Sequence, residues 1–224
     1  MKVYSIAIDG PAGAGKSSVA KAIAKELEFI YIDTGAMYRA IGLKALNKGF
    51  DTSLDKEKIT NMTDNKEIDI KYIEGILNIF TDGENVTDLI RTNEVSLAAS
   101  NVSAIPDVRL KLVEIQRNLA KSKSSVMDGR DIGTYVLPDA DIKIYLTASI
   151  DERAKRRYNE LIEKGVKCDF EQLKSEIALR DKQDMEREFA PLKQAEDAIL
   201  VDTSEMTLEQ SISFVLNLIK EKLF

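Results

Sequence analysis

The chain has 224 residues, of which 44% are apolar and 31% charged, so it can bury the core of a single soluble globular domain. Cys168 is the only cysteine and histidine is absent, which excludes an internal disulfide, a multi-cysteine metal site and histidine-based acid–base chemistry. The net charge of −6 argues against nonspecific nucleic-acid binding, and no apolar run approaches the ~18 residues of a membrane span. With no secretory signal pattern either, we expect a cytoplasmic protein.

In chain order, short apolar strands alternate with amphipathic helices. Strands are predicted over residues 3–8, 29–33, 124–129, 139–148 and 197–204. Helices are predicted over residues 17–27, 36–46, 108–120, 149–165, 170–188 and 207–224. The last helix begins with a capping box formed by Thr207 and Gln210. Its predicted inner face carries Leu208, Ile212, Val215, Leu216 and Ile219. This alternation predicts an α/β fold with a parallel sheet covered by helices on both faces.

One region departs from the alternation. From about Lys66 to Thr87 the residues follow a period of two, are rich in β-branched side chains, and contain the turn signals "EG" at 74–75 and "DGEN" at 82–85. This pattern predicts a small antiparallel insert between helices.

The segment "GPAGAGKSS" directly follows the first strand and opens the first helix. Two glycines with four residues between them, followed by Lys and Ser, match the phosphate-binding loop (P-loop), and both flanking elements that the motif requires are present. The loop predicts an ATP site formed by Gly10, Pro11, Ala12, Gly13, Ala14, Gly15, Lys16, Ser17 and Ser18. Its backbone amides and helix start would face phosphate oxygens, Lys16 would reach the β- and γ-phosphates, and Ser17 would help to hold Mg²⁺.

A P-loop alone does not separate switch GTPases, motor ATPases, small-molecule kinases and helicases. The chain has no guanine-reading "NKxD" segment and no apolar strand ending in "DE", but it places arginines beside aspartates in "DTGAMYR", "DGRDIG" and "RDKQDMER". Such arginines suit transfer between two phosphate-bearing molecules, because their planar fork binds phosphate oxygens in pairs. A monophosphate acceptor is largely dianionic at pH 7 and needs no strong base.

Long stretches of the chain resemble the bacterial cytidylate kinases in order and spacing: "IAIDGPAGAGKSSVAKAIAKEL", "DTGAMYRAI", "MDGRDIGTYVLPDADIKIYLTAS", "ERAKRRYNEL" and "RDKQDMEREFAPLKQAEDA". The resemblance implies transfer of the γ-phosphoryl group of ATP to CMP or dCMP with Mg²⁺, by a monomer. It also implies one P-loop domain divided into a core (1–60, 105–149 and 191–224), a monophosphate-binding insert region (about 61–104) and a helical lid (about 150–190).

The resemblance assigns catalytic roles to Lys16, Arg130, Arg153, Arg157 and Arg187. Arg130 and Arg187 would hold the acceptor phosphate, and Arg153 and Arg157 would close over the transferred group. The neighbouring arginines of the lid, which include Arg156, can substitute for one another. We therefore expect the arginine cluster as a whole to contact the transferred group, rather than one particular member of it.

The acceptor nucleotide is expected to contact residues from several segments. They are Thr34, Tyr38, Arg39, Ser100, Arg109, Asp131, Arg180 and Asp184. Arg39 would bind the acceptor phosphate, and Arg180 and Asp184 would contact the ribose. Cytosine offers an amino donor to a carboxylate such as Asp131, and acceptors to an arginine or hydroxyl such as Arg109 or Ser100.

Ser17, Asp33 and Asp128 are the candidate metal ligands. Some relatives carry glycine in place of Ser17, so the metal need not depend on this hydroxyl throughout the family. Asp33 and Asp128 have helix or turn capping as an alternative role. For Arg39, Arg130 and Asp131 the alternative is a structural ion pair, and Tyr38 can simply pack.

Three other functions stay open from the sequence: another P-loop kinase with UMP, AMP or shikimate as acceptor, a nucleotide-dependent switch, and a nucleic-acid-binding protein. A kinase for another acceptor should lack the combination of "DGRD" and the insert. A switch would not turn over repeatedly, and the acidic charge balance disfavours the third.

Overall fold

The computed structural model describes residues 2–63, 68–73 and 76–223. They form two compact units, Met1–Tyr31 with Lys123–Phe224 and Ile32–Ser122. The second unit contains the predicted insert but extends beyond 61–104 on both sides.

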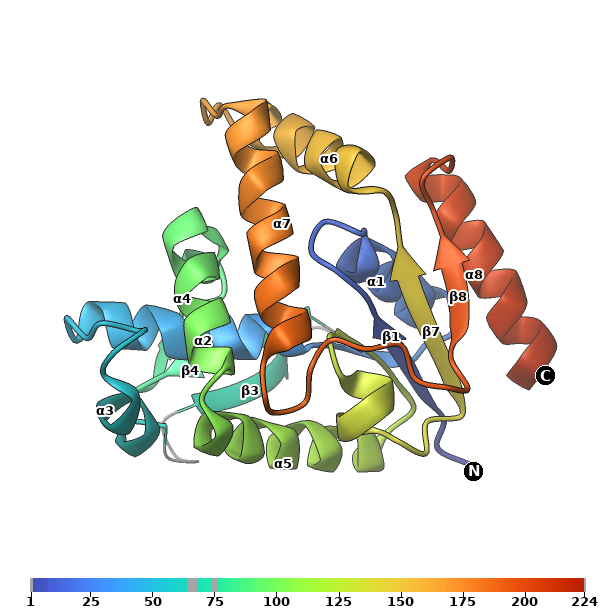
Figure 1. The fold of residues 1–224 in the computed structure, drawn as a ribbon. Helices are drawn as coiled ribbons and strands as arrows, with labels where there is room; N and C mark the ends of the chain where they lie inside the picture. The colour runs from blue at the N-terminus through green and yellow to red at the C-terminus, as the bar shows by residue number, and fades with distance from the viewer. Residues whose placement is uncertain (1, 64–67, 74–75, 224) are drawn as a thin grey trace. The chain divides into compact units, whose positions relative to one another are not determined.

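A five-stranded sheet organises the first unit (Figure 1). Its strand order is β2-β6-β1-β7-β8, in which β1 pairs in parallel with both β6 and β7, and β7 with β8. The strands are β1 (Ser5–Asp9), β2 (Ile30–Asp33), β6 (Ser125–Gly129), β7 (Ile142–Thr147) and β8 (Ile199–Asp202). The last two residues of β2, Ile32 and Asp33, already belong to the second unit. The central strands are buried along their length, as expected of a parallel sheet.

Helices α1 (Lys16–Glu26) and α8 (Leu208–Leu223) pack on this sheet through an apolar cluster that includes Ile8, Val19, Ile23, Val215 and Ile219. The prediction that Leu208 lies on the inner face of α8 was wrong. This residue is 46% exposed, because it occupies the first turn of the helix, beyond the contacts with the sheet. The predicted capping box is confirmed by two reciprocal hydrogen bonds, Thr207 N–H to Gln210 Oε1 (2.9 Å) and Gln210 N–H to Thr207 Oγ1 (3.2 Å).

Two further helices of the first unit, α6 (Ile150–Glu163) and α7 (Phe170–Glu186), lie within residues 150–190, for which a lid is predicted. They share an apolar cluster of Ala154, Leu161, Leu173 and Ile177, which also includes Ala12 of the glycine-rich loop. Ser149 and Asp169 cap the two helices by accepting backbone N–H groups. A five-residue π-helical turn, η2 (Ile132–Val136), follows β6.

The second unit combines helices with an antiparallel sheet. The helices are α2 (Thr34–Asn47), α3 (Lys56–Asn61), the 3₁₀ turn η1 (Leu89–Arg91), α4 (Asn93–Ser103) and α5 (Pro106–Ser122). The sheet order is β3-β4-β5, with β3 (Ile68–Ile73), β4 (Ile76–Thr81) and β5 (Glu84–Asn85). Asp82 and Gly83 both have positive φ and form the predicted tight turn between β4 and β5. The predicted turn at 74–75 lies outside the described residues, as do 66 and 67.

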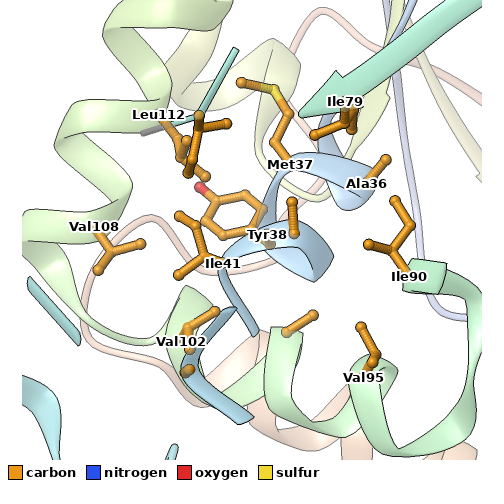
Figure 2. Packing of buried hydrophobic residues seen from close by; sticks show 14 of the residues in the cluster. Ala36, Met37, Tyr38, Ile41, Ile79, Ile90, Val95, Val102, Val108 and Leu112 are labelled. Carbon is orange, nitrogen blue, oxygen red and sulfur yellow. The ribbon is translucent and has the colours of Figure 1, made fainter. Parts of the chain in front are cut away.

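Helix α2 is central to the core of this unit (Figure 2). Met37 and Ile41 are almost fully buried among side chains from β4, α4 and α5, including Ile79, Val102 and Leu112. At Gly42 a side chain would lie 3.0 Å from the Ala98 Cβ of α4, so glycine permits this close helix contact.

The expected fold class is confirmed: a parallel sheet with helices packed on it, and a small antiparallel sheet. Helices α3 and α4 had no counterpart among the predicted elements. Among the described residues, no helix combines the length and apolarity needed to cross a membrane.

Candidate active site

The loop between β1 and α1 has the backbone of a phosphate cradle. Gly10, Gly13 and Gly15 all have positive φ, at 148°, 74° and 86°. A Cβ on Gly10 would lie 1.9 Å from the carbonyl oxygen of Leu146 in β7, so no other residue fits there. Gly15 precedes α1 in the left-handed region and brings no side chain to the helix start. The first amides of α1 therefore face an uncluttered anion site.

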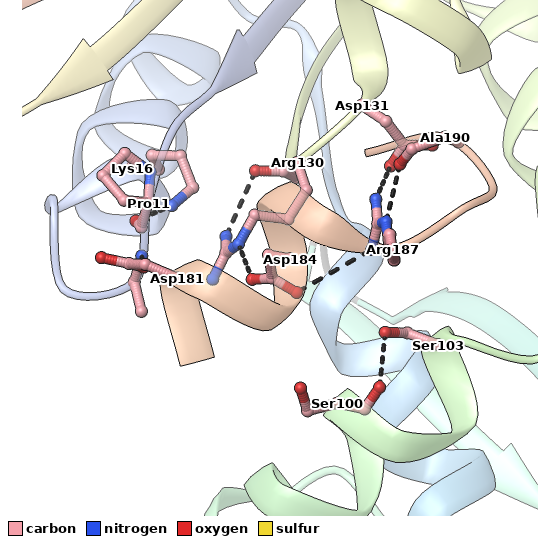
Figure 3. Close-up of polar contacts among 12 residues, drawn as sticks. Pro11, Lys16, Ser100, Ser103, Arg130, Asp131, Asp181, Asp184, Arg187 and Ala190 are labelled. Carbon is pink, nitrogen blue, oxygen red and sulfur yellow. Dashed lines mark hydrogen bonds and ion pairs between the residues drawn. The ribbon is translucent and has the colours of Figure 1, made fainter. Parts of the chain in front are cut away.

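Lys16 is folded back over its own loop. Its Nζ donates to the carbonyl oxygen of Pro11 at 2.6 Å, and the residue is 6% exposed (Figure 3). Burial lowers the pKa of Lys16 well below its ordinary value, and repulsion by Arg130 and Arg180 adds to this, against attraction by Asp128 and Asp9. A bound polyphosphate would place negative charge beside the Lys16 ammonium group and so raise this pKa.

Ser17 and Asp128 meet at the start of α1. Ser17 Oγ donates to Asp128 Oδ2 at 2.8 Å, and Tyr31 Oη donates to Asp128 Oδ1 at 2.9 Å. No group of three or more Cys, Asp or Glu that could enclose a metal occurs in the described part of the chain. Mg²⁺ usually keeps several waters and takes one or two carboxylates plus substrate phosphates, so a hydroxyl beside one buried carboxylate fits it.

Asp9 at the end of β1 fixes the loop that follows β6. Its Oδ1 accepts from Ile132 N–H at 2.8 Å and its Oδ2 from Gly133 N–H at 2.7 Å. Burial raises the pKa of Asp9 to about 7, with Asp131 raising it further, while the two amides and Lys16 oppose the shift. Asp9 was not among the predicted site residues, because its contacts are to backbone amides more than 120 residues away.

Arg130 and Arg187 are held by carboxylates (Figure 3). Arg130 Nε donates to Asp184 Oδ2 at 2.8 Å, and Arg187 Nη2 lies 3.4 Å from Asp131 Oδ1. Burial alone would lower the pKa of Arg130, but Asp184 and other nearby carboxylates raise it above its ordinary value. Burial alone would raise the pKa of Asp184, but the three nearby arginines, Arg130, Arg180 and Arg187, lower it. The structure therefore brings five predicted residues, Arg180 included, into one charged cluster.

The three lid arginines have different surroundings. Arg153 is 7% exposed and donates to Ala148 O, Ala12 O and Asp181 Oδ2. Arg156 binds the carbonyl oxygens of Thr203 and Met206 after β8. Arg157 donates to Glu160 Oε2 at 2.8 Å, near the surface. The three arginines therefore differ in their partners and burial, a difference that the sequence alone did not predict.

The second unit holds the other predicted acceptor residues. Asp33 caps α2 by accepting Ala36 N–H at 2.8 Å and forms an ion pair with Arg39 at 3.1 Å. Both carboxylate oxygens of Asp33 therefore have protein partners. These contacts correspond to the helix-capping and ion-pair roles that the sequence left open as alternatives to metal binding. Thr34, the first residue of α2, is 3% exposed.

Arg109 is 1% exposed and lies under the ring of Tyr38, with 5.3 Å between the guanidinium carbon and the ring centroid. Its Nη1 donates to the carbonyl oxygen of Ser103 at 3.1 Å, and Ser103 Oγ donates to Ser100 O at 2.8 Å. Arg109 of α5 thus contacts Tyr38 of α2 and Ser103 of α4, which lies one turn after Ser100.

The chain is similar in sequence to known proteins over nearly its whole length. A family model described as cytidylate kinase matches residues 6–221. A cytidylate kinase of Caldicellulosiruptor saccharolyticus is 56% identical over 218 residues, 97% of this chain and 96% of that protein. One of Shouchella clausii is 50% identical over 220 residues, 98% of this chain and 97% of that protein.

A solved gluconokinase of Sinorhizobium meliloti is similar in fold, with a TM-score of 0.51, 15% identity, and coverage of 98% of this chain and 93% of that chain. At this identity the likeness supports the fold alone. The match over nearly the whole sequence, together with the P-loop and its paired arginines, shows that the chain belongs to the cytidylate kinase family.

Proposed function

We propose that the protein transfers the γ-phosphoryl group of ATP to CMP or dCMP, producing ADP and CDP or dCDP. The observation that carries this proposal is a set of three cations within one unit. Lys16 lies in the glycine-rich loop, Arg130 is close enough to lower its pKa, and Arg187 faces the same carboxylate, Asp184, as Arg130. The P-loop suits the donor, the two arginines suit a second phosphate, and membership of the family supports the nucleotide acceptor.

The chemistry needs little proton transfer. An oxygen of the acceptor phosphate forms a bond to the γ-phosphorus of ATP as the bond to the β–γ bridging oxygen breaks, and its electron pair leaves with ADP. Because the second pKa of the acceptor phosphate is near 6, the attacking oxygen carries no proton at pH 7. A chain without histidine can therefore do this chemistry.

The protein's contribution is to hold two anions together. Lys16 would leave Pro11 O to bind the β- and γ-phosphates, and Arg130 and Arg187 would exchange part of their carboxylate contacts for the acceptor phosphate. Arg153 and Arg157 belong to the proposed lid, which would keep water from the transferred group. Arg180 and Asp184 would contact the ribose.

In the second unit, Thr34, Tyr38 and Arg39 would border the acceptor, with Arg39 on its phosphate, and Ser100 and Arg109 would contact its base. Mg²⁺, when bound with ATP, neutralises charge on the β- and γ-phosphates, and Ser17 and Asp128 would hold it. Asp33 stays a candidate for ordering the water around the metal. A cytoplasmic monomer is part of the proposal.

The test is a coupled assay of ADP formation with Mg²⁺ and CMP, dCMP, UMP, AMP or shikimate in turn. CMP and dCMP are expected to raise ADP formation far above the rate without acceptor. Lys16→Ala and Arg187→Ala are expected to lower the rate while the circular dichroism spectrum stays native. A best acceptor of another class would replace the proposed substrate, and ATP binding without turnover would favour a switch.

A further inference from the structure

The peptide group between Pro11 and Ala12 is held from both sides. Its carbonyl oxygen accepts from Lys16 Nζ at 2.6 Å, and its N–H donates to Asp181 Oδ1 of α7 at 2.9 Å (Figure 3). In a trans peptide the C=O and N–H point in opposite directions within the peptide plane, so the lysine and the carboxylate lie at opposite edges of one rigid planar group.

Arg153 completes this arrangement. Its Nη1 donates to Ala12 O at 2.9 Å and also to Asp181 Oδ2, while its Nε donates to Ala148 O at 2.9 Å. The Ala12 methyl group packs into the apolar cluster of α6 and α7, and Ala12 is 7% exposed. Backbone N–H, backbone C=O and side chain of one loop residue are thus all attached to the lid helices.

We propose that Asp181 is a positioning residue for the nucleotide: together with Arg153 it sets the orientation of the Pro11–Ala12 peptide, and through it the phosphate cradle and Lys16. This inference rests on the proposed use of the P-loop as the ATP site. Asp181 touches no substrate in this role and acts through the loop backbone.

The reason lies in how the cradle is built. Amides converge on an anion only when successive peptide planes have fixed orientations, and Gly13 and Gly15, both with positive φ, make alternative orientations accessible. Asp181 removes that freedom at the Pro11–Ala12 peptide, and Arg153 holds the carbonyl oxygen of the next peptide, Ala12–Gly13. Without it, a rotated Pro11–Ala12 plane would also move the carbonyl oxygen on which Lys16 rests.

Two substitutions separate this role from simple support of the fold. In Asp181→Asn the amide oxygen can still accept Ala12 N–H, while the amide nitrogen faces Arg153, whose Nη1 retains Ala12 O as acceptor. In Asp181→Ala both interactions are lost. Both variants lose the ion pair with Arg153, so we expect similar decreases in melting temperature.

Nucleotide affinity should differ between the two variants. Isothermal titration with Mg·ADP is expected to give a dissociation constant within about threefold of wild type for D181N, but at least about tenfold weaker for D181A, the loss expected for a charge-assisted hydrogen bond. In the coupled assay the KM for ATP should rise in D181A while the KM for CMP stays within about twofold.

The matched control is Asp151→Asn, because Asp151 forms another ion pair between α6 and α7, with Lys174, at an exposed position. D151N is expected to leave ADP affinity unchanged. Where D181A does not fold, D181S replaces it, since the serine hydroxyl is too short to reach Ala12 N–H. Equal loss of ADP affinity in D181A and D181N, or no loss in either, would overturn the inference. ADP titration needs no acceptor, so failure of CMP as substrate is a separate result.

Discussion

Arg130 and Asp184 form an ion pair with 2.8 Å between Nε and Oδ2, in which the side chains are only 19% and 7% exposed. Asp184 also lies 3.9 Å from Arg187 Nη1, so one carboxylate faces two of the arginines assigned to the acceptor phosphate. The cations are thereby kept in place at the cost of desolvating all three groups.

Removing this carboxylate should therefore reduce stability. Asp184→Ala leaves Arg130 buried without its ion-pair partner, and we expect the free energy of unfolding in urea to fall by about 3–5 kcal/mol. The control is Glu186→Ala on the same helix, whose pair with Lys182 is exposed and should contribute less than about 1 kcal/mol. Similar losses in the two variants would count against a buried anchor.

Lys16 should take up a proton when nucleotide binds. Its pKa is low in the free protein because it is buried beside Arg130 and Arg180, and bound phosphates would raise that pKa. Titration with ADP at a series of pH values from 8 to 10, where the nucleotide phosphates are already deprotonated, is expected to show net proton uptake from the dependence of the heat on buffer ionisation enthalpy. Lys16→Arg should show none, since arginine stays charged. Equal uptake by both proteins would assign the proton to another group.

Asp9 should make stability depend on pH. Its pKa is about 7 in the folded protein and near 3.8 when unfolded, because burial disfavours the carboxylate. Between these values the folded state retains a proton that the unfolded state has lost. The stability that Asp9 contributes is thus complete below pH 3.8 and is lost as the pH rises through 7.

Asp9→Asn removes this titration. We expect the unfolding free energy of wild type, minus that of D9N, to decrease by on the order of 2 kcal/mol between pH 5 and pH 8, measured by urea denaturation. A difference that stays constant or grows over this range would show that Asp9 is ionised throughout.

Asp131 is expected to set the preference for cytosine. A carboxylate accepts from the cytosine amino group, whereas uracil presents a carbonyl oxygen at the same place. Asp131→Ala should therefore reduce the ratio of kcat/KM for CMP to that for UMP by about tenfold or more. Asp139→Ala, at an exposed position of the same connection, is the control. An unchanged ratio in D131A would remove Asp131 from base recognition.

The sequence predicted the elements whose signals are local. Strand β1, the P-loop and α1 follow from an apolar run, spaced glycines and a helical stripe, and the capping box of α8 from two residues three positions apart. Helix α4 was missed because its serines and asparagines are weak helix formers. Its stability comes from packing on α2 at Gly42, which is a tertiary contact.

The candidate site shows the same limit. Motifs identified residues that would meet the ligand, such as Lys16 and Arg130, but not Asp9 and Asp181, which bind backbone amides of distant loops. A carboxylate that accepts from a backbone amide produces no recognisable sequence motif, because almost every residue type can supply the N–H donor. Arg153 and Arg157 were also assigned the same role from the sequence, because the contacts of Arg153 to backbone carbonyl oxygens leave no motif. Of the two, only Arg153 is buried against the glycine-rich loop.

The spacing of Asp181, Asp184 and Arg187 also limits how this protein can change. The three side chains engage the Ala12 amide, Arg130 and Asp131 from successive turns at the end of one helix. Inserting or deleting a single residue between 181 and 184 would rotate everything beyond it by about 100°. All three attachments could then not be kept together, so we expect homologous chains to vary in length elsewhere in the lid and to tolerate no length change in this segment.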